Sequence, residues 1–243
     1  MSKQSVALVT GGSQGIGLAT VRALAAKGFT VVAMGRNPAH FTTALESLPP
    51  ENRERVTFIV GDVRDEESVR STILATTERF GRLDVLVNSA GVSMNAKREL
   101  VATSSDEWRR IMETNLTGTY LMCREALPHL LKSPRGYILN VQSTAAHRSG
   151  PGTSLYAASK FGVRAMTDAL IEEYRNTPLR ISSVSPGPVA TSIWDHKLVP
   201  PGADERARMI RPSDIADVFI WLLERPAHLH IPDITVTPWT SNP

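Results

Sequence analysis

The sequence predicts an α/β fold in which a doubly wound parallel β-sheet carries helices on both faces. Short apolar segments rich in β-branched residues alternate along the chain with longer amphipathic segments. The short segments are apolar throughout, which is typical of strands in a parallel sheet that is covered on both sides. A glycine-rich turn joins the first of them to the first amphipathic segment. No linker or repeat divides the chain, so we expect one domain over residues 1–243.

Each predicted strand except the last is followed by a predicted helix or a polar connection. We expect strands over Val6–Thr10, Thr30–Met34, Val56–Val60, Asp84–Asn88, Tyr137–Val141, Ile181–Val184 and Ile234–Val236. We expect helices over Gly15–Lys27, Glu66–Phe80, Asp106–Leu131, Leu155–Tyr174 and Ser213–Leu223. Parallel strands need right-handed crossovers, and this alternation therefore gives a doubly wound sheet. Residues 186–212 hold five of the sixteen prolines and predict a long functional loop.

Composition excludes several classes of protein. Apolar residues make up 42% of the 243 residues and charged residues 21%, as in an ordinary globular protein. The net charge is 27 − 24 = +3, which is too small to indicate a nucleic-acid surface. No signal peptide is visible, and no apolar run approaches the roughly 18–20 residues that span a bilayer. The single cysteine, Cys123, cannot form an internal disulfide, so we expect a cytoplasmic protein.

The turn after the first strand predicts a nucleotide site. Glycines allow a tight turn and close approach of the backbone to a pyrophosphate, while the start of a helix supplies free N–H groups. The alternative is a tight turn that binds no ligand. In the first interpretation the residues expected at the cofactor are Thr10, Gly11, Ser13, Gln14, Gly15, Ile16 and Gly17.

The end of the second strand indicates which dinucleotide binds. A fold that prefers NAD carries an acidic residue about 20 residues after the turn, where it contacts the ribose hydroxyls. Here Arg36 stands at that place, and no acidic residue follows until Glu46. A guanidinium group suits a 2′-phosphate, and Ser13 could add a hydroxyl. We therefore expect NADP rather than NAD, the alternative being that Arg36 is a solvated loop residue.

Polar and small residues end the third and fourth predicted strands. Asp62, followed by Val63, is placed to accept a hydrogen bond from an adenine amine, although an aspartate in a turn or at a helix N-cap would look the same. Asn88, Ala90 and Gly91 would let a cofactor lie across the carboxyl edge of the sheet.

Tyr156 and Lys160 suggest proton transfer. Residues four apart share one face of a helix. A cation about 5 Å from a phenolate, at an effective dielectric near 20, contributes roughly 3 kcal/mol, or about two pKa units. We therefore expect Lys160 to lower the pKa of Tyr156 toward the working range. A tyrosine and a lysine at this spacing are also common on solvated helix faces, and Ser143, thirteen residues upstream, adds to the functional interpretation.

Taken together, these motifs resemble the short-chain dehydrogenase/reductase family, a Rossmann-like fold, over almost the whole chain. The resemblance implies that Tyr156 is the general acid and base, that Ser143 hydrogen-bonds the substrate oxygen, and that Lys160 binds the nicotinamide ribose. It further implies that Asn115 holds a water in a proton relay. The implied contacts to the nicotinamide come from Pro186, Gly187, Val189 and Thr191. The implied activity is NADP(H)-dependent interconversion of a carbonyl compound and an alcohol.

Other interpretations stay open at this point. An NAD-linked alcohol or sugar dehydrogenase, or a non-catalytic NADP-binding regulator, would share most of these motifs. The resemblance also implies a homodimer or homotetramer, built through the helices at Asp106–Leu131 and Leu155–Tyr174. The segment from His230 to Trp239 departs from the family's glycine-rich ending, which puts the usual tetramer contact in doubt.

Several residues carry weaker signals. We expect Cys123 to be a small core or interface residue rather than a nucleophile. His228 and His230 lack neighbouring ligands, and we expect no metal site. Trp194 is either a core anchor or a wall of the pocket. Arg148 could favour an acidic substrate, but an exposed loop arginine is the simpler interpretation.

Overall fold

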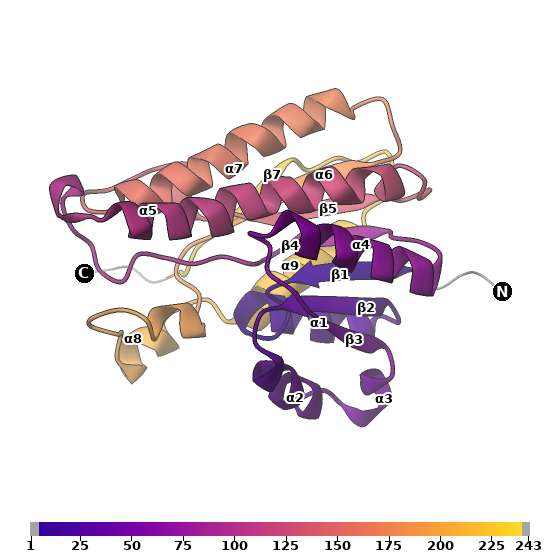
Figure 1. Cartoon of the computed structure of the whole chain (residues 1–243), viewed down its shortest axis with the longest axis horizontal. Helices are drawn as coiled ribbons and strands as arrows, with labels where there is room; N and C mark the ends of the chain where they lie inside the picture. Colours follow the sequence, from indigo (N-terminus) through magenta and orange to yellow (C-terminus); the bar gives the residue numbers. More distant parts are fainter. Residues whose placement is uncertain (1–4, 240–243) are drawn as a thin grey trace.

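A seven-stranded parallel sheet forms the centre of the protein. The computed structural model describes residues 5–239, with the strands in the order β3-β2-β1-β4-β5-β6-β7 (Figure 1). The strands are β1 (Val6–Thr10), β2 (Thr30–Gly35), β3 (Val56–Val60), β4 (Val85–Asn88), β5 (Tyr137–Val141), β6 (Arg180–Pro186) and β7 (Asp233–Val236). Every hydrogen-bonded pair is parallel. The winding reverses between β1 and β4, where such sheets open a crevice at their carboxyl edge.

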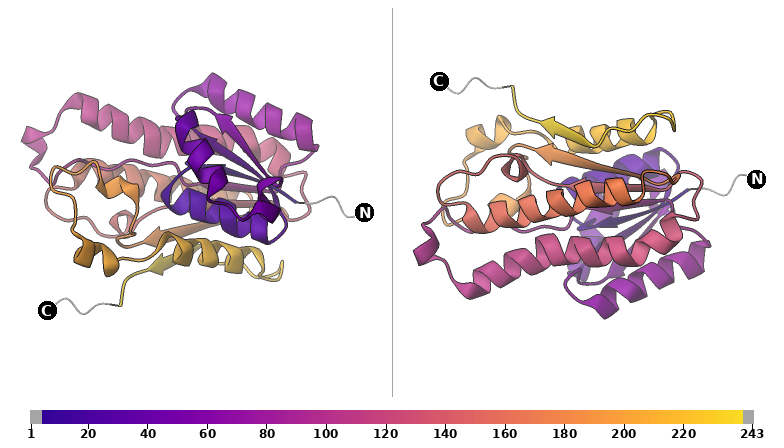
Figure 2. Two further views of the ribbon diagram at one scale, coloured as in Figure 1. Left: turned by 90° about the horizontal axis from the view of Figure 1, so that it is seen from below. Right: turned by 90° about the horizontal axis from the view of Figure 1, so that it is seen from above.

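Helices cover both faces of this sheet (Figure 2). The helices are α1 (Gly15–Ala26), α2 (Pro38–Glu46), α3 (Pro50–Arg53), α4 (Glu66–Phe80), α5 (Ser105–Met112), α6 (Gly118–Leu130), α7 (Ser154–Glu173), α8 (Ala203–Ala207) and α9 (Pro212–Leu223). One buried cluster joins the sheet to α1 and α9 through Leu24 and Phe219. The other joins it to α4 and α6 through Ile73 and Met122, with α7 packed alongside. These two clusters confirm the predicted doubly wound fold.

The predicted elements are present, with three corrections. The single helix expected over Asp106–Leu131 is instead α5 and α6 joined by a π-helical turn, η2 (Glu113–Thr117). Helices α2 and α3 lie in segments for which the sequence analysis predicts no helix. The predicted loop over residues 186–212 contains a 3₁₀ turn, η4 (Ser192–Trp194), and α8, and a parallel bridge pairs Val189 with Ile210.

The edge strand β3 is less buried than its apolar sequence suggests. Val60, the last residue of this edge strand, is exposed. The expectation that every strand is covered on both faces is therefore wrong at this edge. No helix within residues 5–239 combines the length and the apolar character needed to cross a membrane.

Candidate active site

A cavity of about 890 Å³ lies along the carboxyl edge of the sheet, where the segments that follow β1, β2, β3, β4, β5 and β6 meet. Most of the residues proposed from the sequence line it: Gly11, Ser13, Gln14, Gly15, Ile16, Arg36, Asp62, Val63, Ala90, Gly91, Ser143, Tyr156, Lys160, Pro186, Gly187, Val189 and Thr191. Four others do not line it: Thr10, Gly17, Asn88 and Asn115. The topology thus brings residues from the whole length of the chain to one site.

The turn between β1 and α1 is tightly folded. Gly11 has a φ of +63°, in the left-handed region that glycine tolerates best. A Cβ on Gly17 would lie 2.3 Å from the carbonyl oxygen of Gly11, so only glycine fits where the helix folds back on the turn. No side chain caps the N-terminus of α1. The first N–H groups of this helix are therefore available to an anion.

Thr10 fixes this turn to the end of β4. Its Oγ1 accepts hydrogen bonds from the backbone N–H groups of Ser89 and Ala90, each at 3.0 Å. The side chain is buried and faces the neighbouring strand rather than the cavity. Thr10 therefore sets the distance between two walls of the cavity, and its side chain is not free to contact a ligand.

The end of β2 presents an unpaired cation. Arg36 is exposed, lines the cavity and makes no hydrogen bond or ion pair with any residue within 5–239. Its neighbours are occupied, because Asn37 caps α2 by accepting from Ala39 N at 3.0 Å and His40 Nδ1 lies 2.8 Å from Gln14 Nε2. A guanidinium group without a protein partner is suited to bind an anionic group of a ligand.

Asp62, after β3, is held by its own loop. Its carboxylate accepts hydrogen bonds from the Arg64 guanidinium, the shortest at 2.6 Å, and from Arg64 N at 3.0 Å. Burial opposes ionisation of Asp62, but the hydrogen bonds from Arg64 outweigh it and keep its pKa below the ordinary value. Asp62 is therefore an ionised acceptor at the cavity wall, part of whose hydrogen-bonding capacity is used within the loop.

Asn88 lies beneath the cavity rather than in its wall. Its Nδ2 donates to Asn140 Oδ1 at 2.9 Å, and Asn140 in turn donates to Thr167 Oγ1 on α7 at 2.9 Å. These bonds link β4, β5 and α7 within the core. Asn88 therefore supports the strand ends on which the cavity is built.

Three polar side chains meet on the wall formed by β5 and α7. Ser143 follows β5 and accepts a hydrogen bond from Ala145 N at 3.1 Å. Tyr156 and Lys160 lie one helical turn apart on α7, with the Lys160 Nζ 5.8 Å from the centre of the Tyr156 ring. Lys160 Nζ donates to the carbonyl oxygen of Val141 at 2.9 Å. This hydrogen bond holds the ammonium group at the end of β5, two residues before Ser143 in the sequence.

Asn115, in the π-helical turn, holds the neighbouring loop in place. Its Nδ2 donates to Val92 O at 2.9 Å and to Ser159 Oγ at 3.0 Å, and its Oδ1 accepts from Val92 N at 2.8 Å. A Cβ on Gly91 would lie 3.5 Å from Asn115 Oδ1 and 3.9 Å from Lys160 Nζ. Gly91 therefore leaves open a space between these two side chains.

Burial controls the ionisation of the Tyr156 and Lys160 pair. Burial raises the pKa of the Tyr156 phenol, and a hydrogen bond with Ser143 offsets part of that increase. Burial lowers the pKa of Lys160 to about 8. The expectation that Lys160 lowers the pKa of Tyr156 is therefore not met by the chain's own groups, because both are removed from water and the ammonium donates to Val141 rather than to the phenol.

The segment after β6 closes one side of the cavity. Trp194 lines the cavity and donates from Nε1 to Val189 O at 2.8 Å, so of the two predicted alternatives it is a wall of the pocket. Further on, Leu198 N donates to Asn95 O at 2.9 Å, which joins this segment to the loop that follows Gly91. The cavity is therefore bounded by two segments that are far apart in sequence.

Sequence reasoning missed three cations that line this end of the cavity: Lys97, Arg110 and Lys197. Lys97 and Lys197 lie in irregular segments and Arg110 lies on α5, and no residue pattern marks a site at any of the three. The one available signal is that Lys197 lies within residues 186–212, which the sequence predicts to form a long functional loop. Arg148, the cation considered from the sequence, is exposed and does not line the cavity.

Two other residues considered from the sequence, Cys123 and His230, lie outside the cavity. Cys123 is buried, and burial raises the pKa of its thiol to about 12, which confirms a core residue rather than a nucleophile. His230 hydrogen-bonds to the carbonyl oxygen of Ile181 at 2.8 Å.

Comparison with known proteins gives consistent matches. The family model for short chain dehydrogenases matches residues 5–198. An uncharacterized oxidoreductase of Thermotoga maritima is 36% identical over 92% of this chain and 90% of its own length, and one of Staphylococcus saprophyticus is 31% identical over 97% and 98%.

Solved structures of similar proteins cover nearly the whole chain. An alcohol dehydrogenase from the archaeon Thermococcus sibiricus, complexed with 5-hydroxy-NADP, superposes with a TM-score of 0.89 at 28% identity, over 99% of each chain. A 3-ketoacyl-(acyl-carrier-protein) reductase from Brucella melitensis, complexed with NADH, gives 0.86 at 26% identity, over 98% of this chain and 99% of the other.

Proposed function

This chain belongs to the short-chain dehydrogenase family, and we propose that it is an NADP(H)-dependent oxidoreductase that interconverts a ketone or aldehyde with the corresponding alcohol. The observation that carries the proposal is the position of Ser143, Tyr156 and Lys160 in one wall of the cavity that also contains the glycine turn and Arg36. A dinucleotide can extend along this edge from β2 to β5, with its reactive end beside Tyr156.

The residues present fit such a cofactor. The close packing of Gly11 and Gly17 keeps side chains away from the turn, and the uncapped start of α1 offers N–H donors to a pyrophosphate. Asp62 and Val63 would contact the adenine, and Ala90 and Gly91 the middle of the cofactor. Pro186, Gly187, Val189 and Thr191 would contact the nicotinamide. The bound cofactor would supply or accept the hydride.

The proposed proton chemistry follows from Tyr156. Because its pKa is raised by burial, the phenol is protonated near neutral pH and can donate to a carbonyl oxygen as the carbon is reduced. Ser143 would hold the same oxygen by a hydrogen bond and stabilise developing negative charge. In the oxidation direction Tyr156 would act as the base, and the positive charges of Lys160 and of an oxidised nicotinamide would then stabilise the phenolate.

Other residues would act through those that touch the ligand. Thr10 and Gly17 shape the turn, and Asn88 supports the ends of β4 and β5. Asn115 positions Val92 and Ser159 and, as we propose, a water in a relay that connects Lys160 with solvent.

The preference for NADP rests on Arg36. The similar solved structures contain NADP in some cases and NADH in another, so they do not decide the question. In this chain the end of β2 carries an unpaired arginine and no acidic side chain. An arginine in that position would bind a 2′-phosphate, whereas an acidic residue would bind the ribose hydroxyls.

We propose further that the protein is a cytoplasmic homodimer or homotetramer. The outer faces of α6 and α7 expose Tyr120 and Phe161, two large apolar side chains on adjacent helices. Burying such side chains against a second copy would favour association.

The proposal is tested by titrating the protein with NADPH and NADH, followed by fluorescence, and then monitoring absorbance at about 340 nm with a panel of ketones and aldehydes. We expect tighter binding of NADPH and oxidation of NADPH that depends on the carbonyl compound. Preference for NADH would favour an NAD-linked alcohol or sugar dehydrogenase. Tight binding of NADPH without turnover of any carbonyl compound would favour a regulator.

A further inference from the structure

Three cations line the end of the cavity nearest Ser143 and Tyr156, and one of them, Arg110, lies 4.0 Å from the Glu107 carboxylate. Lys97, Arg110 and Lys197 line this end, whereas among residues 5–239 the only acidic residue that lines any part of the cavity is Asp62. Asp62 follows β3, on the other side of β1 and β4 from Ser143, and is paired with Arg64. Lys97 and Lys197, in contrast to Arg110, make no ion pair with a carboxylate within residues 5–239.

Lys197 is fixed in the wall by several contacts. Its Nζ donates to the carbonyl oxygen of Met94 at 2.5 Å and to Ser93 Oγ at 3.2 Å. The same ammonium lies 5.5 Å from the centre of the Trp194 ring. An ammonium has three donors, and these contacts account for two of them. Lys197 thus holds a positive charge, with donor capacity remaining, where the two bounding segments meet.

Lys97 faces it from the other segment and has no protein partner. Within residues 5–239 its side chain makes no hydrogen bond or ion pair, and it is exposed at the cavity. A Cβ on Gly152 would lie 3.0 Å from the Lys97 Cβ, and Arg98 N donates to Gly152 O at 3.2 Å. Lys97 is therefore held beside the loop that leads from Ser143 to Tyr156.

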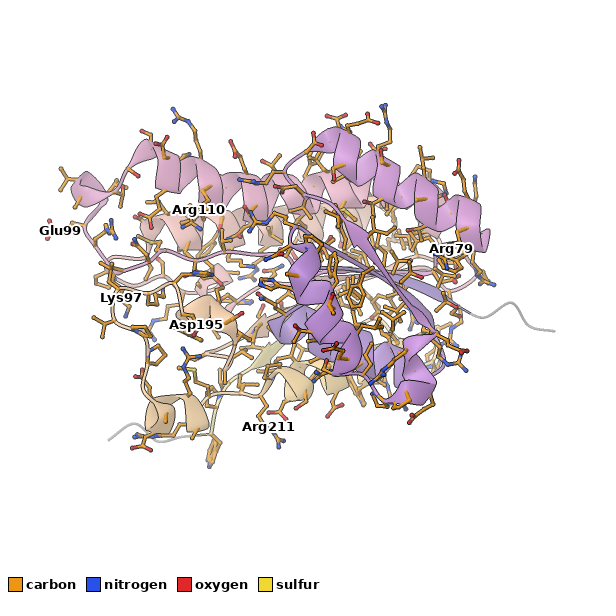
Figure 3. All side chains as sticks on the ribbon, turned by 60° about the horizontal axis from the view of Figure 1, so that its bottom comes forward. Arg79, Lys97, Glu99, Arg110, Asp195 and Arg211 are labelled. Carbon is orange, nitrogen blue, oxygen red and sulfur yellow. The ribbon has the colours of Figure 1, made fainter. Side chains whose placement is uncertain are left out.

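The neighbouring carboxylates are engaged elsewhere. Glu107 accepts from Asn95 N at 3.3 Å and lies 3.8 Å from Arg98 and 4.0 Å from Arg110, so one carboxylate serves two guanidinium groups. Asp195 is paired with Arg206 at 2.6 Å. Figure 3 shows Lys97, Arg110 and Asp195 at the same end of the molecule, with Glu99 further out.

The shift in the pKa of Lys197 indicates that its positive charge is only partly compensated. Burial lowers the pKa of Lys197; Glu107 opposes this effect, and repulsion from Lys97 adds to it. An anion that lies between two ammonium groups that repel each other stabilises the positive charge of both. Such an arrangement is selective for a ligand of negative charge.

We propose that the substrate is an anionic carbonyl compound, whose carboxylate or phosphate group lies between Lys97 and Lys197 while its carbonyl group lies at Ser143 and Tyr156. This inference rests on the proposed function. In the reduction, hydride adds to the carbonyl carbon and the Tyr156 proton goes to the carbonyl oxygen. The anionic group takes no part in bond making and remains unchanged, so an oxo acid gives a hydroxy acid.

The test compares short oxo acids of increasing chain length with their methyl esters, as substrates of the intact enzyme with NADPH. We expect kcat/KM for at least one acid to exceed that of its ester. In Lys97→Gln we expect the acid-to-ester ratio to fall about tenfold, which corresponds to about 1.4 kcal/mol. Lys97→Arg, which keeps the charge, should retain most of the ratio. Arg148→Gln removes an exposed cation outside the cavity and should leave the ratio unchanged.

A second series distinguishes the two anions. Phosphorylated aldehydes and ketones are compared with their unphosphorylated forms, and a larger loss in Lys97→Gln for this series would identify phosphate as the group bound. Turnover of esters and acids at equal rates in the wild type, with no preference for phosphorylated compounds, would overturn the inference and leave the proposed function intact. Absence of turnover of every carbonyl compound would overturn both.

Discussion

Replacing Arg36 is expected to change cofactor preference without disturbing the fold. The guanidinium group is exposed and makes no hydrogen bond or ion pair within the described residues, and its effect on the protein's own groups is a coulombic one that helps to lower the pKa of Asp62. Arg36→Gln should therefore weaken binding of NADPH while leaving binding of NADH nearly unchanged.

The size of the effect follows from the exposure of Arg36. Two unit charges about 4 Å apart interact by about 1 kcal/mol in water and about 4 kcal/mol at an effective dielectric near 20. An exposed side chain at a cavity rim lies between these limits, and we take about 2 kcal/mol. At about 1.4 kcal/mol per factor of ten, the dissociation constant of NADPH should rise about thirtyfold.

The assay is a fluorescence titration of wild type and Arg36→Gln with both cofactors. Arg148→Gln is the matched control, because it removes an exposed arginine that does not line the cavity. A second variant, Arg36→Asp, should improve binding of NADH, since an acidic residue there can accept from the ribose hydroxyls. Equal loss of NADPH and NADH affinity in Arg36→Gln would refute the reasoning.

Two further outcomes are expected from buried charged groups. Because burial lowers the pKa of Lys160 to about 8, kcat/KM for carbonyl reduction should fall as pH rises through that value. Lys160→Arg should move this decrease to higher pH. A pH profile of the wild type that is flat to about pH 10 would contradict the expectation. Burial opposes ionisation of Asp84, but hydrogen bonds from Arg82 and Ser133 outweigh the effect of burial and lower the pKa of Asp84. The ionised carboxylate therefore contributes to the free energy of unfolding above about pH 4, and this contribution is lost as pH falls through the native pKa. Asp84→Ala should lower the free energy of unfolding by about 3 kcal/mol in urea titrations at neutral pH. Asp106→Ala, at an exposed site, should change the free energy of unfolding by less than about 0.5 kcal/mol. Equal effects of the two substitutions would show that the buried contacts of Asp84 do not stabilise the fold.

The sheet and its main helices could be predicted because their signals are local. A buried parallel strand is a short apolar run, and α4 has a recognisable capping residue at each end. Asp65 accepts from Ser68 N at 3.0 Å at the start of α4, and Gly81, with a φ of +73°, ends it. Helix α2 has similar features at its start, since Asn37 is its N-cap and Pro38 is its first residue. Its nine residues nevertheless lie in a segment for which the sequence analysis predicts no helix.

The π-helical turn over Glu113–Thr117 could not be predicted, because it depends on partners far away in the sequence. Asn115 reaches Val92 and Ser159 only when the helix is locally widened. The sequence identifies Asn115 through a family motif, yet nothing in the local pattern interrupts the helix. Tertiary hydrogen bonds set the backbone there, and they become visible only in the folded chain.

The ionisation of Tyr156 also depends on the whole fold. The i, i+4 spacing places Lys160 near the phenol, but the sequence does not show that Lys160 is buried or that it donates to Val141. The cations Lys97 and Lys197 illustrate the same point, since each lies in an irregular segment and they meet only because Leu198 pairs with Asn95. Sequence patterns thus place the reacting residues, while the fold sets their charge state and the shape of the pocket.

The most direct test of the proposed mechanism is the turnover of Tyr156→Phe with NADPH and a carbonyl substrate of the wild type. Phenylalanine keeps the ring and removes the hydroxyl group, which carries the proton to be donated and the hydrogen bond with Ser143. We expect the rate to fall by a factor of at least about 10³, while the dissociation constant of NADPH stays within about threefold of the wild type. A rate close to that of the wild type would contradict the assignment of Tyr156 as the general acid.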